Sequence, residues 1–181
     1  IHEDTTLSEK SWEKAESRLQ SEAITLALKK SNLSPTEVDV IFAGDLLNQC
    51  ISSTFGLRSL GIPFLGQYGA CSTMAQTLAM AALFVEGGLA GNAAAVTSSH
   101  FCSAERQFRF PLEYGSIRTP TAQWTVTGSG AAVIGSGTQG PYVSEITIGK
   151  IVDLGIKDAN NMGAAMAPAA AATLSTFFED T

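Results

Sequence analysis

The stretch that decides the fold is Gly69-Ala70-Cys71-Ser72-Thr73, which joins two apolar segments. Residues 62–68 before it predict a short buried strand, and residues 72–89 after it, rich in Ala, Leu and Met, predict a buried helix. Cys71 is therefore expected at a helix N-terminus, where free N–H groups and the helix dipole favour a thiolate or hold an anion. Free cysteine is also among the most buried residue types, so a purely structural role for Cys71 stays open.

Strands and helices alternate on both sides of this junction. The predicted helices cover 8–30, 46–60 and 164–178, and a capping box with proline predicts one further helical turn at 34–37. The predicted strands cover 38–44, 62–68, 93–99, 124–135 and 142–154, and 101–122 is expected to be irregular. This alternation predicts an α/β fold with a mainly parallel sheet between helices.

Three residues with reactive or charged side chains stand just past the ends of predicted strands: Asp45, Cys71 and His100. Ligands of parallel sheets bind at the carboxyl ends of the strands. The shared position of these residues therefore favours a functional role for Cys71.

Composition excludes several classes of function. The 181 residues carry a net charge of −6, and a basic cluster of Arg106, Arg109 and Arg118 is too small for a nucleic-acid surface. Three cysteines without a CxxC pair predict neither a disulfide framework nor a metal site, which suits a reducing compartment. Residues 135–140 match GxGxxG, but Pro141 and a predicted strand follow where a dinucleotide site needs a helix.

Membrane and export signals are also not expected. The chain opens with acidic residues and no apolar run, so no signal peptide is predicted. The uncharged stretch 59–85 is interrupted by glycines and Pro63, and its continuous apolar part, 74–85, is too short to span a bilayer. We therefore expect a soluble protein.

Several segments resemble known families. Residues 69–73, 96–100 and 127–133 resemble, in this order, the first half of the thiolase fold as found in initiating ketoacyl synthases. Residues 43–49, 97–100 with 104–109, 122–130 and 162–170 resemble the stage V sporulation protein AD family more specifically. The resemblance covers nearly the whole chain.

The resemblance implies a thiolase-like α/β fold, represented by its first βαβαβ half with a mixed, mainly parallel sheet flanked by helices. Residues 1–141 would form this N-terminal half without its first strand. Residues 142–181 would supply the first strand and helix of a second half that is otherwise largely missing.

The resemblance also implies a function. The family binds dipicolinic acid (pyridine-2,6-dicarboxylate) without catalysis and supports its uptake into the developing spore. A homodimer is implied, peripheral at the spore inner membrane, with other proteins of the stage V sporulation A operon as partners, a link to germination and no cofactor. The residues expected to bind the ligand are Cys71, Ser72, Thr73, Asp45, Asn48, His100, Arg106 and Arg109.

Two other functions stay open: an acyl-transferring condensing enzyme with Cys71 as nucleophile, and a structural subunit with a vestigial pocket. A cysteine nucleophile needs a paired base. We expect His100 to be an interior or dimer-interface histidine and not this base, since the family's catalytic partners lie in the second half. Burial in the following apolar helix is expected to offset the dipole and keep Cys71 a neutral thiol near pH 7.

Overall fold

The computed structural model describes residues 2–108, 125–137, 140–158 and 161–181. The chain divides into two compact units. The first unit comprises Ile1–Tyr114 and Thr125–Gln139, and the second comprises Gly115–Trp124 and Gly140–Thr181.

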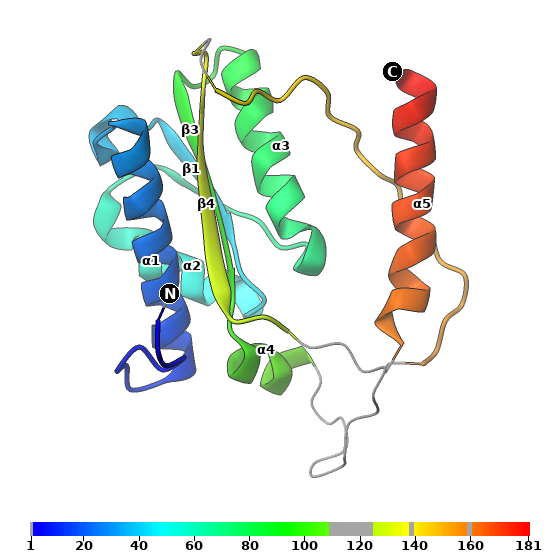
Figure 1. Cartoon of the computed structure of the whole chain (residues 1–181), viewed down its shortest axis with the longest axis horizontal. Coiled ribbons are helices and arrows are strands. Elements are labelled where there is room, and N and C mark those ends of the chain that lie inside the picture. The colour runs from blue at the N-terminus through cyan, green and yellow to red at the C-terminus, as the bar shows by residue number, and fades with distance from the viewer. Residues whose placement is uncertain (1, 109–124, 138–139, 159–160) are drawn as a thin grey trace. The chain divides into compact units, whose positions relative to one another are not determined.

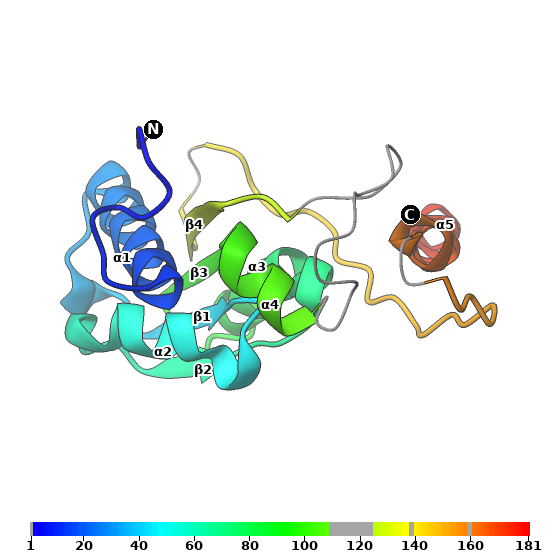
Figure 2. The same cartoon turned by 90° about the horizontal axis from the view of Figure 1, so that it is seen from below.

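A four-stranded sheet in the order β2-β1-β3-β4 forms the centre of the first unit (Figures 1 and 2). Its strands are β1 (Val40–Gly44), β2 (Phe64–Gly66), β3 (Asn92–Ser99) and β4 (Gly128–Gly135). β1 runs parallel to β2 and β3, whereas β4 is antiparallel to β3. The predicted mixed, mainly parallel sheet is therefore confirmed.

Helices cover both faces of this sheet (Figures 1 and 2). α1 (Trp12–Ser31) and α2 (Ile51–Leu57) pack on one face, where Ile41 and Ala43 of β1 enter the core. α3 (Thr73–Glu86) packs on the other, against Phe42. Strands buried on both faces need apolar residues at every position, which explains the unbroken run Val-Ile-Phe-Ala-Gly in β1.

α1 begins later than predicted. Leu7 and Ser8 have positive φ angles of 50° and 59°, so the helix does not start there. It starts after Ser11, whose hydroxyl oxygen accepts a hydrogen bond from the Lys14 N–H at 3.3 Å, and it ends at Asn32 in the left-handed region. The predicted helical turn after Ser34 is present as η1 (Pro35–Glu37).

Two other segments differ from the prediction. The continuous helix expected over 46–60 is broken into η2 (Asn48–Cys50), α2 and η3 (Arg58–Leu60), because Gln49 and Cys50 have left-handed φ angles of 61° and 51°. The segment 101–122, expected to be irregular, begins with the helix α4 (Phe101–Phe108). Its first bond runs from the Ala104 N–H to the His100 carbonyl oxygen at 2.9 Å, and residues 109–122 lie outside the described residues.

The second unit contains α5 (Met162–Asp180), capped by the Asn161 side chain, which accepts a hydrogen bond from the Ala164 N–H at 3.1 Å. Pro168 lies inside α5 and not in its first turn as predicted. The prediction of a strand over 142–154 is wrong: these residues carry no strand. A strand needs a neighbouring strand that takes up its backbone hydrogen bonds, and the described sheet consists of β1 to β4 alone.

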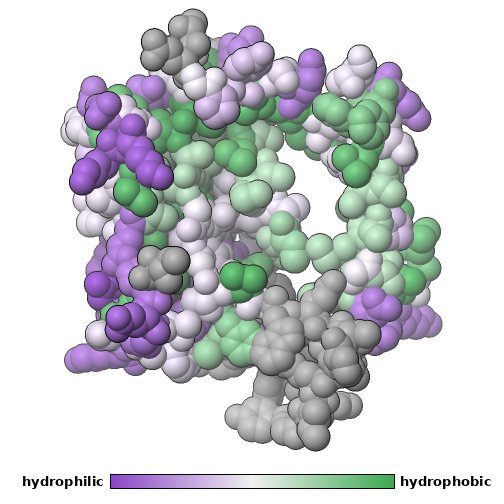
Figure 3. Space-filling model, viewed as in Figure 1, coloured by the Kyte–Doolittle hydropathy of each residue, from purple (hydrophilic) through white to green (hydrophobic). Residues whose placement is uncertain are grey.

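The helices of the first unit differ in surface character. Figure 3 shows strongly hydrophilic residues over α1 and apolar to neutral ones over α3. Met74 and Leu83 of α3 are exposed apolar residues. Among the described residues, no helix has the length and apolar character needed to cross a membrane.

Candidate functional site

The carboxyl ends of β1, β2 and β3 meet at one edge of the sheet because the three strands are parallel. Asp45 follows β1 directly, and His100 follows β3 directly. The turn that carries Cys71 follows β2 and leads into α3. The three residues expected past strand ends therefore all belong to this edge.

Asp45 is a buried carboxylate that organises the loop after β1. One carboxylate oxygen accepts a hydrogen bond from the Leu47 N–H at 2.9 Å. The other accepts from the N–H and the hydroxyl of Ser53, at 2.8 and 2.5 Å. Since Ser53 lies in the first turn of α2, Asp45 caps this helix from the preceding loop.

The loop after β1 is joined to the segment after β2. The thiol of Cys50 donates a hydrogen bond to the Gln67 carbonyl oxygen at 3.2 Å, and the Gln67 N–H donates to the Ala43 carbonyl oxygen at 2.8 Å. Burial, followed by the charges of Asp45 and Cys50, raises the pKa of the adjacent Tyr68 hydroxyl. These contacts bring Asp45, Cys50 and Tyr68 into one cluster.

The turn at 69–73 is closed by its own polar groups. The Gly69 N–H donates to the Thr73 hydroxyl oxygen at 3.0 Å, and the Ser72 hydroxyl donates to the Gly69 carbonyl oxygen at 2.7 Å. Ala70 has a left-handed φ of 49°. Thr73 is buried, whereas Cys71 and Ser72 are exposed. The expected burial of Cys71 is therefore wrong, because η4 (Ala70–Ser72) precedes α3 and leaves this thiol outside the helix packing.

His100 is fully buried, and both nitrogens of its ring are engaged. Nε2 lies 2.9 Å from the Thr5 carbonyl oxygen and therefore donates to it, and Nδ1 accepts from the Cys102 N–H at 3.2 Å. The ring also packs against Trp12 of α1, with the ring centroids 5.2 Å apart and the ring planes tilted by 34°. His100 is thus an interior histidine in contact with the helix layer opposite α3.

Three predicted site residues remain: Asn48, Arg106 and Arg109. Asn48 opens η2 and is exposed. Arg106 lies in α4, but its side chain is outside the described residues, as is the whole of Arg109. The structure thus joins Asp45 and Thr73 to the same edge and leaves the two arginines untested.

Sequence reasoning missed a buried polar cluster behind this edge. Glu16 and Gln20 of α1 are fully buried. The carboxyl group of Glu16 is hydrogen-bonded to the hydroxyl of Ser98 in β3 and to the hydroxyl of Ser103 in α4. Burial raises the pKa of Glu16 to about 7. The Ser98 hydrogen bond lowers this pKa, and the charge of Asp45 raises it. The signal was the row Glu16, Gln20, Ile24 and Leu28, which the four-residue spacing places on one buried face of α1.

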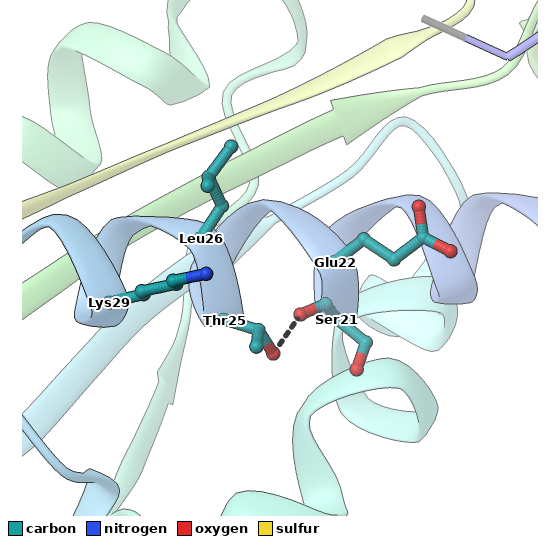
Figure 4. Close-up of a pocket in the computed structure, with 5 residues that line it drawn as sticks. All are labelled: Ser21, Glu22, Thr25, Leu26 and Lys29. Carbon is teal, nitrogen blue, oxygen red and sulfur yellow. Dashed lines mark hydrogen bonds between the residues drawn. The ribbon is translucent and has the colours of Figure 1, made fainter.

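A shallow pocket of about 260 Å³ lies on the surface of α1, lined by Ser21, Glu22, Thr25, Leu26 and Lys29 (Figure 4). Its lining comes from this single helix and includes none of the predicted ligand residues. Across the described part of the chain, no group of three His, Cys, Asp or Glu side chains is arranged to hold a metal ion.

Comparison of the sequence with known proteins identifies its family. The family model of stage V sporulation protein AD matches residues 1–181. The chain belongs to the stage V sporulation protein AD family. It is 48% identical over 179 residues to the stage V sporulation protein AD of Bacillus subtilis (strain 168), covering 99% of this chain and 53% of that protein. The chain thus spans about half the length of this relative.

Solved structures agree with the predicted thiolase-like fold. The tetronic acid condensing enzyme AbyA1 is similar with a TM-score of 0.54 and 24% identity, over 77% of this chain and 43% of that one. A variant of OleA from Xanthomonas campestris gives a TM-score of 0.51 at 15% identity, over 65% of this chain and 40% of that one. At these identities the similarity concerns the fold alone.

Proposed function

We propose that this chain is part of a non-catalytic protein that binds dipicolinic acid and supports its uptake into the developing spore. The membership in the sporulation family supports the cellular context. The anion would be held at the carboxyl edge of the sheet, near the exposed residues Cys71 and Ser72 at the start of α3. A helix N-terminus attracts carboxylates through its dipole and its N–H groups.

The observation that supports the proposal within this chain is the bonding of His100, which sets this histidine apart from Cys71. A cysteine nucleophile needs a base within hydrogen-bonding reach. The ring of His100 instead bonds to Thr5 and Cys102 and packs against α1, in the layer opposite the helix that follows Cys71. Cys71 is therefore proposed to form part of the ligand site without acting as a nucleophile.

The ligand must be attracted locally, because the chain carries a net charge of −6. The Ser72 hydroxyl and the Ser72 N–H both donate to the Gly69 carbonyl oxygen, and the Gly69 N–H donates to Thr73, so the N–H groups of Ala70 and Cys71 are the proposed donors. Arg106 and Arg109 are proposed to supply the positive charge, as expected from the sequence. In the cell we propose a homodimer that acts with other proteins of its operon at the spore inner membrane.

Isothermal titration calorimetry of the full-length protein with dipicolinate tests this function. Benzene-1,3-dicarboxylate is the matched control, since it keeps both carboxylates and lacks the ring nitrogen. Binding of dipicolinate that weakens in Arg106→Gln and Arg109→Gln variants is expected. No heat and no thermal stabilisation with millimolar dipicolinate would exclude the proposal.

Acyl transfer is the second candidate, and the exposure of Cys71 in a fold shared with condensing enzymes favours it. It requires an acyl group bound to the Cys71 sulfur after incubation with acyl-coenzyme A. Intact-mass spectrometry of the full-length protein detects this adduct, with Cys71→Ala as control.

The structural-subunit alternative instead predicts that Cys71→Ala leaves the dipicolinate content of spores unchanged.

A further inference from the structure

Glu16 bridges three elements of the first unit from within the core. The Ser98 hydroxyl of β3 lies 2.8 Å from its Oε1, and the Ser103 hydroxyl of α4 lies 3.0 Å from its Oε2. Glu16 itself belongs to α1 and is fully buried. Among the described residues, this carboxyl group takes part in no ion pair.

The hydrogen bonds around Ser103 fit a protonated Glu16. The Ser103 hydroxyl lies 3.0 Å from Glu16 Oε2 and 3.2 Å from the His100 carbonyl oxygen, but a hydroxyl has one proton to donate. If Glu16 carries a proton on Oε2, it donates to Ser103, and Ser103 donates to His100. Both contacts are then made. If Glu16 is ionised, Ser103 can serve only one of the two acceptors.

The bridge continues from Glu16 to the loop after β1. Nε2 of Gln20 lies 2.7 Å from the Ser98 hydroxyl and 2.9 Å from the Ser53 hydroxyl. Ser53 in turn donates to the Asp45 carboxylate. The Gln20 Oε1 has no hydrogen-bond partner within the described residues. Nε2 of Gln20 also lies 3.1 Å from the Gly44 carbonyl oxygen, so its two protons are shared among three acceptors. The chain of bonds therefore reaches Asp45 and has no spare Gln20 proton for a second negative charge.

The charges that face Glu16 do not favour its ionisation. Burial is the main cause that raises the pKa of the Glu16 carboxyl group. The negative charge of Asp45 raises this pKa further. α2, β3 and β4 carry no titratable side chain. Other titratable groups on neighbouring elements are Arg58 in η3, Cys102, Glu105 and Arg106 in α4, His100, and His2, Glu3, Asp4, Glu9 and Lys10 before α1.

We propose that the protonated Glu16 is a positioning residue that locks α1, α4 and the Asp45 loop together, and that loss of its proton loosens this edge of the sheet. The rigidity of the sheet edge that carries the candidate site would therefore depend on pH. The proposal does not depend on dipicolinate, because it concerns the free protein.

The size of the effect follows from proton linkage. With a pKa of about 7 in the closed edge and the ordinary value of 4.5 in the loosened edge, the opening equilibrium increases about tenfold between pH 6 and pH 8. Amide hydrogen exchange of the full-length protein measures this opening equilibrium in peptides that cover residues 45–53 and 100–104. The rates are corrected for the pH dependence of intrinsic exchange.

The experiment compares three proteins. The wild type is expected to show the tenfold rise in the opening equilibrium, and Glu16→Gln is expected to abolish it because an amide cannot ionise. The control Glu86→Gln, which removes the same charge from an exposed position, is expected to retain the rise. A rise that persists in Glu16→Gln, or that is missing in the wild type, would overturn the proposal.

A second measurement needs no substitution and covers the case in which Glu16→Gln does not fold. The carboxyl carbon of Glu16 in the wild type is followed by ¹³C NMR from pH 4 to pH 9. A midpoint near 7 with coupled shifts at Ser98 and Ser103 supports the proposal. A midpoint near 4.5, or shifts confined to Glu16, contradicts it.

Discussion

Gly44 at the end of β1 lies against Thr73 at the start of α3, so closely that a Cβ on Gly44 would be 2.5 Å from Thr73 Cγ2. The same Cβ would be 2.1 Å from the Gln67 carbonyl oxygen. β1, the segment after β2 and the Cys71 turn thus meet where a side chain has no room. This contact holds the candidate site to the centre of the sheet.

Gly44→Ala is expected to destabilise the protein by about 1–3 kcal/mol, the usual cost of overpacking a core. The backbone of Gln67 cannot move aside without disturbing its bond to Ala43. Urea unfolding followed by circular dichroism measures the change. Gly130→Ala is the control, since a Cβ there meets open space. Equal stability of the two variants would contradict the close packing.

Asp45→Asn is expected to lower the free energy of unfolding by about 2 kcal/mol, because the hydrogen bonds that a charged carboxylate accepts from Leu47 and Ser53 are weakened. It also removes the charge that raises the pKa of Glu16, so this pKa should fall. Urea unfolding and the NMR titration of Glu16 give the two results. Asp153→Asn, which weakens one exposed bond from the Gly155 N–H, should change neither.

The stability of the protein is expected to fall between about pH 4.5 and pH 7. The folded state holds the Glu16 proton up to a pKa of about 7, whereas the unfolded chain releases it near 4.5. Folding therefore binds a proton in this window, and its contribution is complete below the window and lost above it. The total is on the order of 3 kcal/mol.

Denaturant unfolding at a series of pH values measures this slope. Other carboxylates oppose it at low pH, so the comparison that counts is the wild type minus Glu16→Gln. A difference curve that is flat from pH 4.5 to pH 7 would show that Glu16 titrates normally in the folded protein.

Cys71 is expected to react with iodoacetamide well before Cys50. Cys71 is exposed, whereas Cys50 is buried, bonds to the Gln67 carbonyl oxygen, and has a pKa raised by burial and by the Asp45 charge. Peptide mapping after timed alkylation from pH 5 to pH 9 gives both rates. A Cys71 rate that reaches its plateau below pH 7 would reveal an activating base and favour acyl transfer. Faster reaction of Cys50 would contradict the described edge.

The layered fold could be predicted because it depends on local patterns. β1 and β3 are short apolar runs, and α1 and α3 are long enough for their periodicity to be recognised. α4 was not predicted, because the prolines and glycines after Phe108 dominate the segment from 101 to 122. Its apolar residues Phe101, Ala104 and Phe108 do follow helical spacing.

The site was harder to predict than the fold. Strand ends correctly placed Asp45 and His100 at one edge, but sequence does not reveal that the His100 ring turns towards Trp12. Glu16 and Gln20 look like solvent-facing helix residues until Ile24 and Leu28 are placed on the same face. The exposure of Cys71 depends on the left-handed Ala70, which no local sequence rule predicts for alanine.

The three consecutive alanines of β3, 93–95, are almost completely buried, with their side chains shared between the two helical layers. Their short side chains set the thickness of the molecule, because longer ones would move α1 or α3 away from the sheet. The Cys71 turn is joined directly to α3, and Glu16 and Gln20 belong to α1, so each would move with its helix. The spacing of the edge can therefore be adjusted from the middle of the sheet: Ala95→Val moves one layer, Ala94→Val moves the other, and neither touches a predicted ligand residue.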